Sequence, residues 1–278
     1  MKAEGIRTGL TGLTVLLALE CAAPPARAGD ATPPAPVRGY PALWWDDVAY
    51  GVTEPTRWDG QDWLYASVDA AAIVGTAAFL DRPLRNWSQR NKGSSFEKTA
   101  NHFETFGTTG SLAVIGGFYL EGALRHDPQA EDTAVDALAA SIVASGIITP
   151  VFKRVAGRSR PEAHQGVSHF RPFSSAQSLP SGHATQAFAV ASVIAARYDN
   201  PWVDGAAYAA AGLVGLARMD HNAHFASDVL AGAIIGTTVG RAVVRLNDRK
   251  RIEWAGGPVT FAPWIGPRGA GLGVSLDY

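Results

Sequence analysis

A short stretch near the middle of the chain combines small polar residues with a histidine at the start of an apolar run. It reads SLPSGHATQ, residues 178–186, and the residues that follow are apolar enough to form a helix. Ser181, Gly182 and His183 would then lie at the N-terminus of this helix. Unpaired backbone N–H groups and the helix dipole attract anions there. The sequence therefore predicts an anion site with Ser181 and the Gly182 amide as donors.

Basic residues on both sides of this stretch favour a phosphate-like anion. Lys153 and Arg160 precede it, in KRVAGRSRP, and Arg218 follows it, in ARMDHNAHFASD. The planar guanidinium fork of arginine matches the spacing of two phosphate oxygens. These cations and the helix N-terminus together predict a site that binds a tetrahedral oxyanion.

A histidine and an aspartate follow Arg218 at a spacing that suits catalysis. His224 and Asp228 are one helical turn apart, so the carboxylate can keep one ring nitrogen protonated. The other nitrogen then carries a lone pair and can act as a nucleophile. His183 is the remaining titratable group of the set and is the expected proton donor.

The three blocks together resemble the signature of the type 2 phosphatidic acid phosphatase superfamily, which also contains bacterial acid phosphatases and vanadium haloperoxidases. The resemblance covers roughly residues 150–232. The third block departs from the family pattern at Ala217, where a serine commonly precedes the arginine. This change is expected to remove one supporting hydrogen bond. The resemblance implies an all-α helical bundle with the site between a central helix pair.

The resemblance also implies a reaction. It is the metal-independent hydrolysis of phosphomonoesters or pyrophosphates, lipid phosphates among them, through a phosphohistidine, and no cofactor is expected. His224 would attack phosphorus, Asp228 would hold its imidazole, and His183 would protonate the leaving oxygen. The residues expected to stabilise the phosphoryl oxygens are Lys153, Arg160, Ser181, Gly182 and Arg218.

Three alternatives stay open at this point. A vanadium haloperoxidase would hold vanadate as cofactor in the same site, with His224 as its ligand, although such enzymes are usually longer chains. A non-catalytic phosphate- or lipid-binding protein would need only the cations, so the two histidines and Asp228 speak against it. His221, His224 and Asp228 could form a metal site by spacing, but the nearby cations would repel a divalent metal.

Composition narrows the partners. Lys and Arg number 24 and Asp and Glu number 25, for a formal charge of −1 over 278 residues. This balance gives no indication of a nucleic-acid surface or a polybasic membrane anchor. A phosphorylated small molecule or lipid is the expected partner. The length suits one main domain, which we place at residues 44–256.

The N-terminal residues predict export. Residues 1–28 combine Lys2 and Arg7, an apolar run over 10–19, and the triplet Ala26-Arg27-Ala28, as in a secretory signal peptide. Residues 29–43 are rich in Pro and Ala and are expected to form a flexible tether. The predicted location is therefore the periplasm or the cell envelope.

Periodicity predicts helices and one hairpin. The helical ranges are 62–80, 95–106, 109–125, 130–155, 183–198, 202–217 and 226–247, with an irregular loop over 157–180. Alternation over 257–278 predicts a short C-terminal β-hairpin.

Apolar segments of the chain are interrupted by charge, for example at Asp136 and Lys153. The uninterrupted apolar runs are shorter than the ~20 apolar residues of a membrane span. The sequence therefore favours a soluble helical protein, with short helices in a membrane bundle as the alternative. The eight tryptophans are expected to serve packing rather than a lipid interface.

Overall fold

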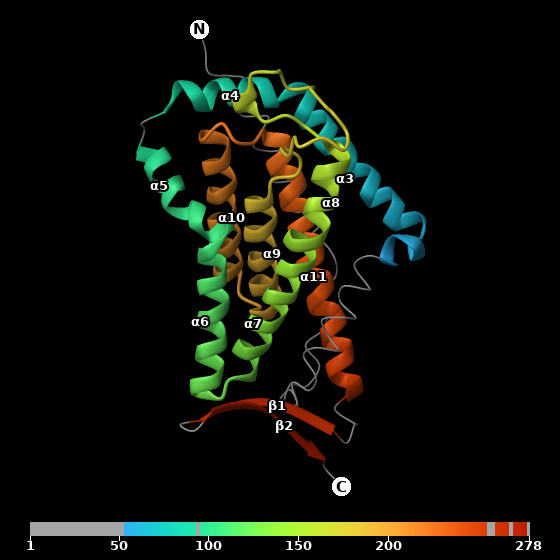
Figure 1. The fold of residues 1–278 in the computed structure, drawn as a ribbon, viewed down its shortest axis with the longest axis vertical. Coiled ribbons are helices and arrows are strands. Elements are labelled where there is room, and N and C mark those ends of the chain that lie inside the picture. The colour runs from blue at the N-terminus through green and yellow to red at the C-terminus, as the bar shows by residue number, and fades with distance from the viewer. Residues whose placement is uncertain (1–52, 93–94, 255–258, 267–268, 277–278) are drawn as a thin grey trace. The chain divides into compact units, whose positions relative to one another are not determined.

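The computed structural model describes residues 53–92, 95–254, 259–266 and 269–276, and its domain is all-α, as the sequence predicts. The predicted signal peptide and tether lie outside these residues. The helices, shown in Figure 1, are η1 (Glu54–Arg57), α3 (Gly60–Phe79), α4 (Asp81–Arg90), α5 (Ser95–Phe103), η2 (Glu104–Gly107), α6 (Thr109–Arg125), α7 (Pro128–Ser141), η3 (Ile142–Ile148), α8 (Thr149–Ala156), η4 (Pro161–Ala163), α9 (Gly182–Arg197), α10 (Pro201–Asp220) and α11 (Ala226–Trp254).

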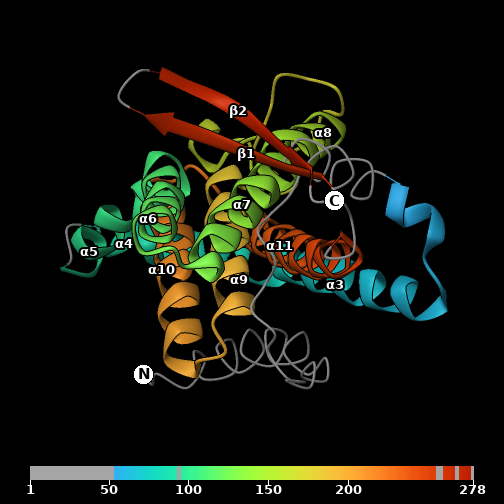
Figure 2. The same cartoon turned by 90° about the horizontal axis from the view of Figure 1, so that it is seen from below.

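Helix α9 is the centre of the bundle. It packs against α7, α10 and α11, and Figure 2 shows it among these helices. Every residue from 184 to 193 is buried, because alanines and other small side chains are spread around the whole helix. A helix that is apolar all round is stable only where neighbours cover every face. The start of α9, which carries Ser181 to His183, is therefore held by a fully packed element.

Three glycines of α11 let this helix approach α9 closely. Gly232, Gly236 and Gly240 follow one another at intervals of one turn. A Cβ atom at Gly232 would lie 2.6 Å from the Ser181 carbonyl oxygen, and one at Gly236 would lie 2.4 Å from that of Thr185. Such small-residue stripes allow two helix backbones to come into contact. This contact brings the first turns of α9 and α11 together.

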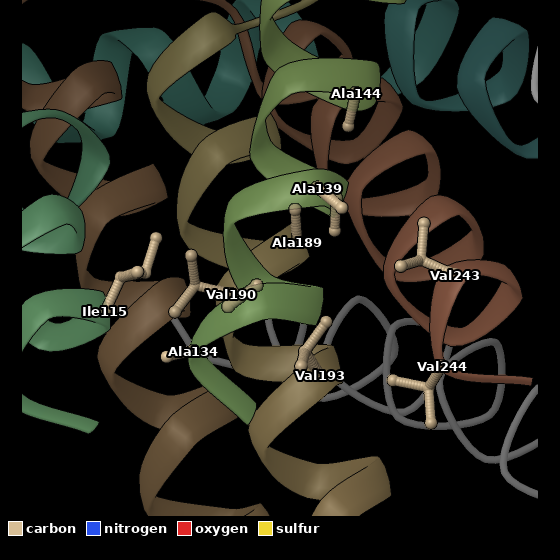
Figure 3. Packing of buried hydrophobic residues seen from close by; sticks show 11 residues of the cluster. Ile115, Ala134, Ala139, Ala144, Ala189, Val190, Val193, Val243 and Val244 are labelled. Carbon is tan, nitrogen blue, oxygen red and sulfur yellow. The ribbon is translucent and has the colours of Figure 1, made fainter. Parts of the chain in front are cut away.

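The main buried cluster is made of short aliphatic side chains (Figure 3). Alanines and valines of α7, η3, α9 and α11 meet Ile115 of α6 there. The cluster comprises Ile115, Ala134, Ala137, Ala139, Ala140, Ala144, Ala189, Val190, Val193, Val243 and Val244. Because these side chains are small, the helices are closely spaced and have little freedom to slide.

The helix predicted over 130–155 forms, but it is not a uniform α-helix. Residues Ile142–Ile148 adopt a π-helix between α7 and α8. Such bulges often occur near functional sites, and this one lies one turn before Lys153. Gly157 ends α8 with a φ of 55°, in the left-handed region that glycine adopts readily. The irregular loop predicted over 157–180 follows and contains only the short η4.

Helix α4 was not predicted. Its sequence, DRPLRNWSQR, is polar and contains Pro83, so no apolar period marks it as a helix. It follows α3 after a bend of 55°. Asp81 and Ser88 are nevertheless buried. Polar contacts to the rest of the bundle, rather than an apolar face, hold this helix in place.

The expectation that no helix is long and apolar enough to cross a membrane is wrong. Among the described residues, Pro128–Ala156 and Ala226–Arg249 reach that length and composition, and the bent pair α3 and α4 would add a third if counted as one span. Asp136 does not interrupt the first helix. Its Oδ2 accepts a hydrogen bond from Arg197 Nε at 3.0 Å, and its Oδ1 accepts one from Asn247 Nδ2 at 2.8 Å. A buried carboxylate with such partners is compatible with an otherwise apolar helix.

Large apolar side chains also lie on the outside of the bundle. Trp63, Trp87 and Trp202 are exposed, contrary to the packing role that the sequence favours for them. On α8, Val151 and Phe152 are more than half exposed at 56% and 54%. Contiguous exposed apolar residues mark contact with a partner or a membrane.

The predicted C-terminal hairpin is present. Strand β1 (Val259–Gly266) pairs antiparallel with β2 (Gly269–Leu276), with Val259 opposite Leu276. It carries none of the predicted site residues.

Candidate active site

The three sequence blocks meet at one end of the bundle. Figure 1 shows the C-terminal ends of α8 and α10 and the N-terminal ends of α9 and α11 at this same end. The Ser181 amide donates to the Asp228 carbonyl oxygen at 2.9 Å, which joins α9 to α11. The Cε of Lys153 lies 3.9 Å from the position of a Cβ on Gly182, which joins α8 to α9. The structure therefore brings the predicted site residues together.

His224 and Asp228 face each other across the start of α11. His224 precedes the helix and Asp228 lies in its first turn, so the pair forms at the helix N-terminus rather than along its side. The distance from His224 Nδ1 to Asp228 Oδ2 is 3.7 Å, and both side chains are buried. This is longer than a hydrogen bond, as is common for catalytic pairs without substrate. Asp228 therefore lies on the Nδ1 side of the ring and not on the Nε2 side.

A tight turn positions His224. The amides of Ala223 and His224 both donate to the Arg218 carbonyl oxygen, at 3.1 and 3.2 Å. His224 Nδ1 has no hydrogen-bond partner in the structure although it is buried. Burial lowers the pKa of His224, and the Asp228 carboxylate opposes this effect. Burial therefore favours the neutral form of the imidazole.

His183 lies in the first turn of α9 and is half-buried. Burial lowers its pKa from 6.5 to about 4; the positive charge of Arg218 adds to the shift, and the Glu104 carboxylate opposes it. His183 is thus neutral at physiological pH when the site holds no anion. The negative charge of a bound phosphate would raise this pKa and favour the protonated form.

The predicted cations lie at different depths around the His224–Asp228 pair. Lys153 Nζ donates to the Gln177 carbonyl oxygen at 2.6 Å, and the side chain is half-buried. Arg218 is mostly buried and forms an ion pair with Glu104. Arg160 is the most exposed of the three and lies 3.5 Å from Glu162. Lys153 and Arg218 therefore line the interior of the site, and Arg160 lies at its rim.

Ser181 and Gly182 occupy the predicted helix N-terminus. Ser181 is the N-cap of α9 and accepts a hydrogen bond from the Ala184 amide at 3.5 Å. Its hydroxyl proton remains able to donate to a bound anion. A Cβ at Gly182 would make only ordinary contacts, the nearest at 3.8 Å, so glycine leaves the amide open rather than relieving a clash.

The structure adds four residues that the sequence argument did not include in the site. Glu104 of η2 pairs with Arg218 and, at 3.1 Å, with His221 Nδ1. Arg158 and Ser178 both bond to the Asp228 carboxylate, each at 2.5 Å, and Asp81 pairs with Arg158. Arg158 could have been found from the sequence, because it is a basic residue inside the first sequence block. Asp81 and Glu104 are far from the blocks in sequence and carry no such signal.

The metal site considered from spacing is not assembled. His221 faces Glu104, whereas His224 faces Asp228. In the part of the chain that the structure describes, no group of three or more His, Cys, Asp or Glu side chains could hold a metal ion. The arrangement instead places cations and a helix N-terminus around a buried imidazole.

Comparison with known proteins agrees with the sequence blocks. Residues 135–252 match the family model of the PAP2 superfamily, and this range contains all the predicted site residues. The chain is 37% identical over 94 residues to a lipid A 1-phosphatase of Porphyromonas gingivalis, covering 33% of this chain and 19% of that protein. It is 35% identical over 104 residues to a lipid A 1-phosphatase of Rhizobium etli, covering 34% and 43% respectively. The chain thus spans less than half the length of these curated relatives.

The solved structures to which the chain is similar include LpxE of Aquifex aeolicus. That comparison has a TM-score of 0.47 and 20% identity, and it covers 60% of this chain and 95% of the other. A transmembrane PAP2 type phosphatidylglycerolphosphate phosphatase of Bacillus subtilis gives 0.46 and 19%, covering 67% and 94%. Residues 135–252, which contain the three sequence blocks, are thus similar to the PAP2 superfamily.

Proposed function

We propose that this protein is a metal-independent phosphatase that hydrolyses lipid phosphates through a phosphohistidine on His224. The observation that carries the proposal is the buried His224 imidazole. Asp228 lies on its Nδ1 side, and cations and the N-terminus of α9 surround it. A site that only binds phosphate needs the cations but not this oriented base.

Substrate binding would use the groups that now have weak or replaceable partners. The phosphoryl oxygens would accept hydrogen bonds from Lys153 and Arg218 and from the hydroxyl and amide at the start of α9. Arg160, at the rim, would contact the substrate as it enters. The phosphate charge would raise the pKa of His183, so that this residue holds a proton in the complex.

In the first chemical step, His224 Nε2 attacks phosphorus. The N–P bond forms as the ester P–O bond breaks, and His183 gives its proton to the departing alkoxide, which leaves as the alcohol. Asp228 stabilises the positive charge that develops on the imidazole, and the cations stabilise the equatorial oxygens.

In the second step, a water molecule attacks phosphorus. His183, now neutral, accepts a proton from this water, the new P–O bond forms and the N–P bond breaks. Inorganic phosphate leaves, and His183 is protonated again while His224 returns to its neutral form. Neither step requires a metal ion.

Exposed apolar residues favour a lipid substrate over a small soluble one. Val151, Phe152 and Val155 flank Lys153 on α8 and lie more than half exposed. Within the part of the chain that the structure describes, two helices have the length and composition of membrane spans. The curated relatives are named lipid A 1-phosphatases. A substrate with its phosphate in the site and its acyl chains along α8 would use both features.

The proposed location is the cell envelope. The apolar helices favour membrane association, and the signal-like pattern of residues 1–28 favours export. Mass spectrometry of the protein isolated from its native envelope would then show a mature N-terminus near Gly29, whereas an intact Met1 in the processed protein would exclude cleavage there.

A substrate panel tests the proposed function. Purified protein in detergent should release phosphate from a lipid phosphate faster than from nitrophenyl phosphate, and a chelator should leave both rates unchanged. Vanadate should inhibit by resembling the five-coordinate transition state. Halide oxidation with vanadate and peroxide, without phosphate release, would instead support the haloperoxidase alternative. Activity that disappears with chelator and returns with zinc would contradict metal independence.

A further inference from the structure

The Asp228 carboxylate is held by more groups than the orientation of one histidine requires. Its Oδ1 accepts a hydrogen bond from Arg158 Nη1 at 2.5 Å. Its Oδ2 accepts from Ser178 Oγ at 2.5 Å and from the Phe225 amide at 2.9 Å. The amide and the hydroxyl fix the position of the carboxylate, whereas Arg158 adds a full positive charge beside it.

That positive charge is itself paired with a second carboxylate. Arg158 Nη2 donates to Asp81 Oδ2 at 2.6 Å, and Asp81 comes from α4, far away in sequence. Arg158 is only 1% exposed, and Asp81 and Asp228 are fully buried. Asp81 also accepts from the Ser227 amide at 2.8 Å and from its hydroxyl at 2.6 Å, next to Asp228. Three buried charged groups thus form one continuous chain that ends at the catalytic pair.

The alternating charges of Asp81, Arg158 and Asp228 determine how strongly Asp228 acts on His224. Without Asp81, the positive charge of Arg158 would offset the negative charge of Asp228. The stabilisation that Asp228 gives to a positively charged His224 imidazole would then be weaker. Asp81 balances Arg158, so the three groups together carry one negative charge. That charge remains available to the imidazolium that forms when His224 attacks phosphorus.

We propose that Asp81 and Arg158 are positioning residues for the catalytic pair: Arg158 fixes the Asp228 carboxylate, and Asp81 neutralises Arg158 so that Asp228 keeps its full effect on His224. The inference deepens the proposed function and rests on His224 as the nucleophile. Neither residue would contact the substrate.

Other charges also face His224 and must stay constant in any test. Asp228 comes from α11, Lys153 from α8, Arg218 from α10 and His183 from α9. Replacement of Asp81 leaves all four side chains in place. A change in the titration of His224 would then report the charge carried through Arg158.

The test is the charge series Asp81→Asn and Asp81→Asn with Arg158→Gln. The titration of His224 is followed by NMR of histidine-labelled protein and assigned by loss of its signal in His224→Asn. Asp81→Asn leaves the Arg158 charge unbalanced, so the pKa of His224 should fall by at least about half a unit. The second substitution removes that charge, so the pKa should return toward the wild-type value. This readout needs no turnover and stays informative even if the protein is not a phosphatase.

Activity gives the second readout. In Asp81→Asn, kcat for nitrophenyl phosphate should fall about 10- to 100-fold, the usual effect of removing a supporting partner. The dissociation constant for tungstate, a phosphate mimic, should stay the same, because Lys153 and Arg218 are untouched. The acid limb of kcat/KM should move to lower pH in the single variant and return in the double variant.

Asp136→Asn is the matched control. Asp136 is equally buried and pairs with Arg197 through Nε at 3.0 Å, but it lies in α7 away from the catalytic pair. It should lower the melting temperature without moving the titration of His224. If Asp81→Asn fails to fold, the double variant replaces both charges by amides and carries the activity test alone. An unshifted His224 titration in Asp81→Asn, an equal shift in Asp136→Asn, or no return in the double variant would each overturn the proposal.

Discussion

The Glu104 carboxylate pairs with the Arg218 guanidinium inside the site, where a substrate phosphate is proposed to bind. Glu104 also lies 3.1 Å from His221 Nδ1, so its two oxygens have separate partners. A phosphate that bonds to Arg218 must therefore compete with a carboxylate already present. The pair keeps the guanidinium oriented while the site is empty, at a cost to phosphate affinity.

Glu104→Gln should tighten the binding of inorganic phosphate. The amide keeps the shape of the side chain but removes the competing charge, so the inhibition constant of phosphate should fall by up to about tenfold, or ~1.4 kcal/mol. Product inhibition of nitrophenyl phosphate hydrolysis measures this constant. Weaker phosphate binding in Glu104→Gln would mean that Glu104 serves chiefly to orient Arg218.

Gly107→Ala should impair catalysis by displacing His183. A Cβ at Gly107 would lie 2.7 Å from the His183 Cβ and 2.9 Å from Val214 Cγ1, so α9 or η2 must move. Misplacement of a catalytic group by about 1 Å can cost up to ~10²-fold in rate. We expect kcat to fall while the protein remains folded.

Gly116→Ala in α6 is the control for this substitution. No atom lies within 4 Å of a Cβ at Gly116, so alanine should be accommodated and should stabilise the helix by about 0.5–1 kcal/mol. Equal activity losses in the two variants would exclude a specific effect on His183.

The residues that the sequence assigns to one site lie together in the structure, and the features that mark them are local patterns. The His224–Asp228 spacing, the cations and the PSGH stretch each indicate a role before any fold is known. The residues that hold these side chains in place cannot be recognised in this way. Asp81 and Glu104 pair with Arg158 and Arg218 only after the helices pack, and no local pattern records such contacts.

In the fold, too, the sequence predicts what local patterns record and misses what depends on contacts between distant residues. The long apolar periods predict most helices, and the predicted loop over 157–180 begins directly after α8 ends at Ala156. Helix α4 was missed because its polar sequence is stabilised by partners from elsewhere, such as Asn222, which accepts from Arg85 Nε at 2.8 Å. The length of the apolar helices was underestimated because charged residues such as Asp136 are neutralised by buried partners that the sequence does not reveal.

The proposed role of His183 as proton donor predicts a dependence on the leaving group. An alkoxide needs a proton as it departs, whereas nitrophenolate is a weak base and does not. His183→Ala should therefore reduce kcat/KM for an alkyl phosphate by ~10²–10⁴-fold and for nitrophenyl phosphate much less. Thermal denaturation of the variant serves as the check on folding. Equal losses for both substrates would show that the role of His183 is wrongly assigned.

Anion binding should take up a proton. The pKa of His183 is about 4 in the free site, so the ring is neutral near pH 7, and a bound dianion favours its charged form. Binding is therefore coupled to protonation, and affinity rises as the pH falls. Tungstate is a suitable probe because it does not itself titrate near neutral pH. Calorimetry should show tighter tungstate binding at about pH 5.5 than at about pH 8, and a smaller difference in His183→Asn. Affinity that falls toward acid pH would contradict this coupling.

The phosphohistidine on His224 is the central claim, and direct trapping tests it most sharply. Protein in turnover with nitrophenyl phosphate is quenched in alkali, where phosphohistidine is stable, and digested for mass spectrometry. We predict one phosphoryl group on the peptide that contains His224, and none on that peptide in His224→Ala, which should also lack activity toward every substrate. Phosphoryl transfer to another residue, or full turnover in His224→Ala, would contradict the mechanism.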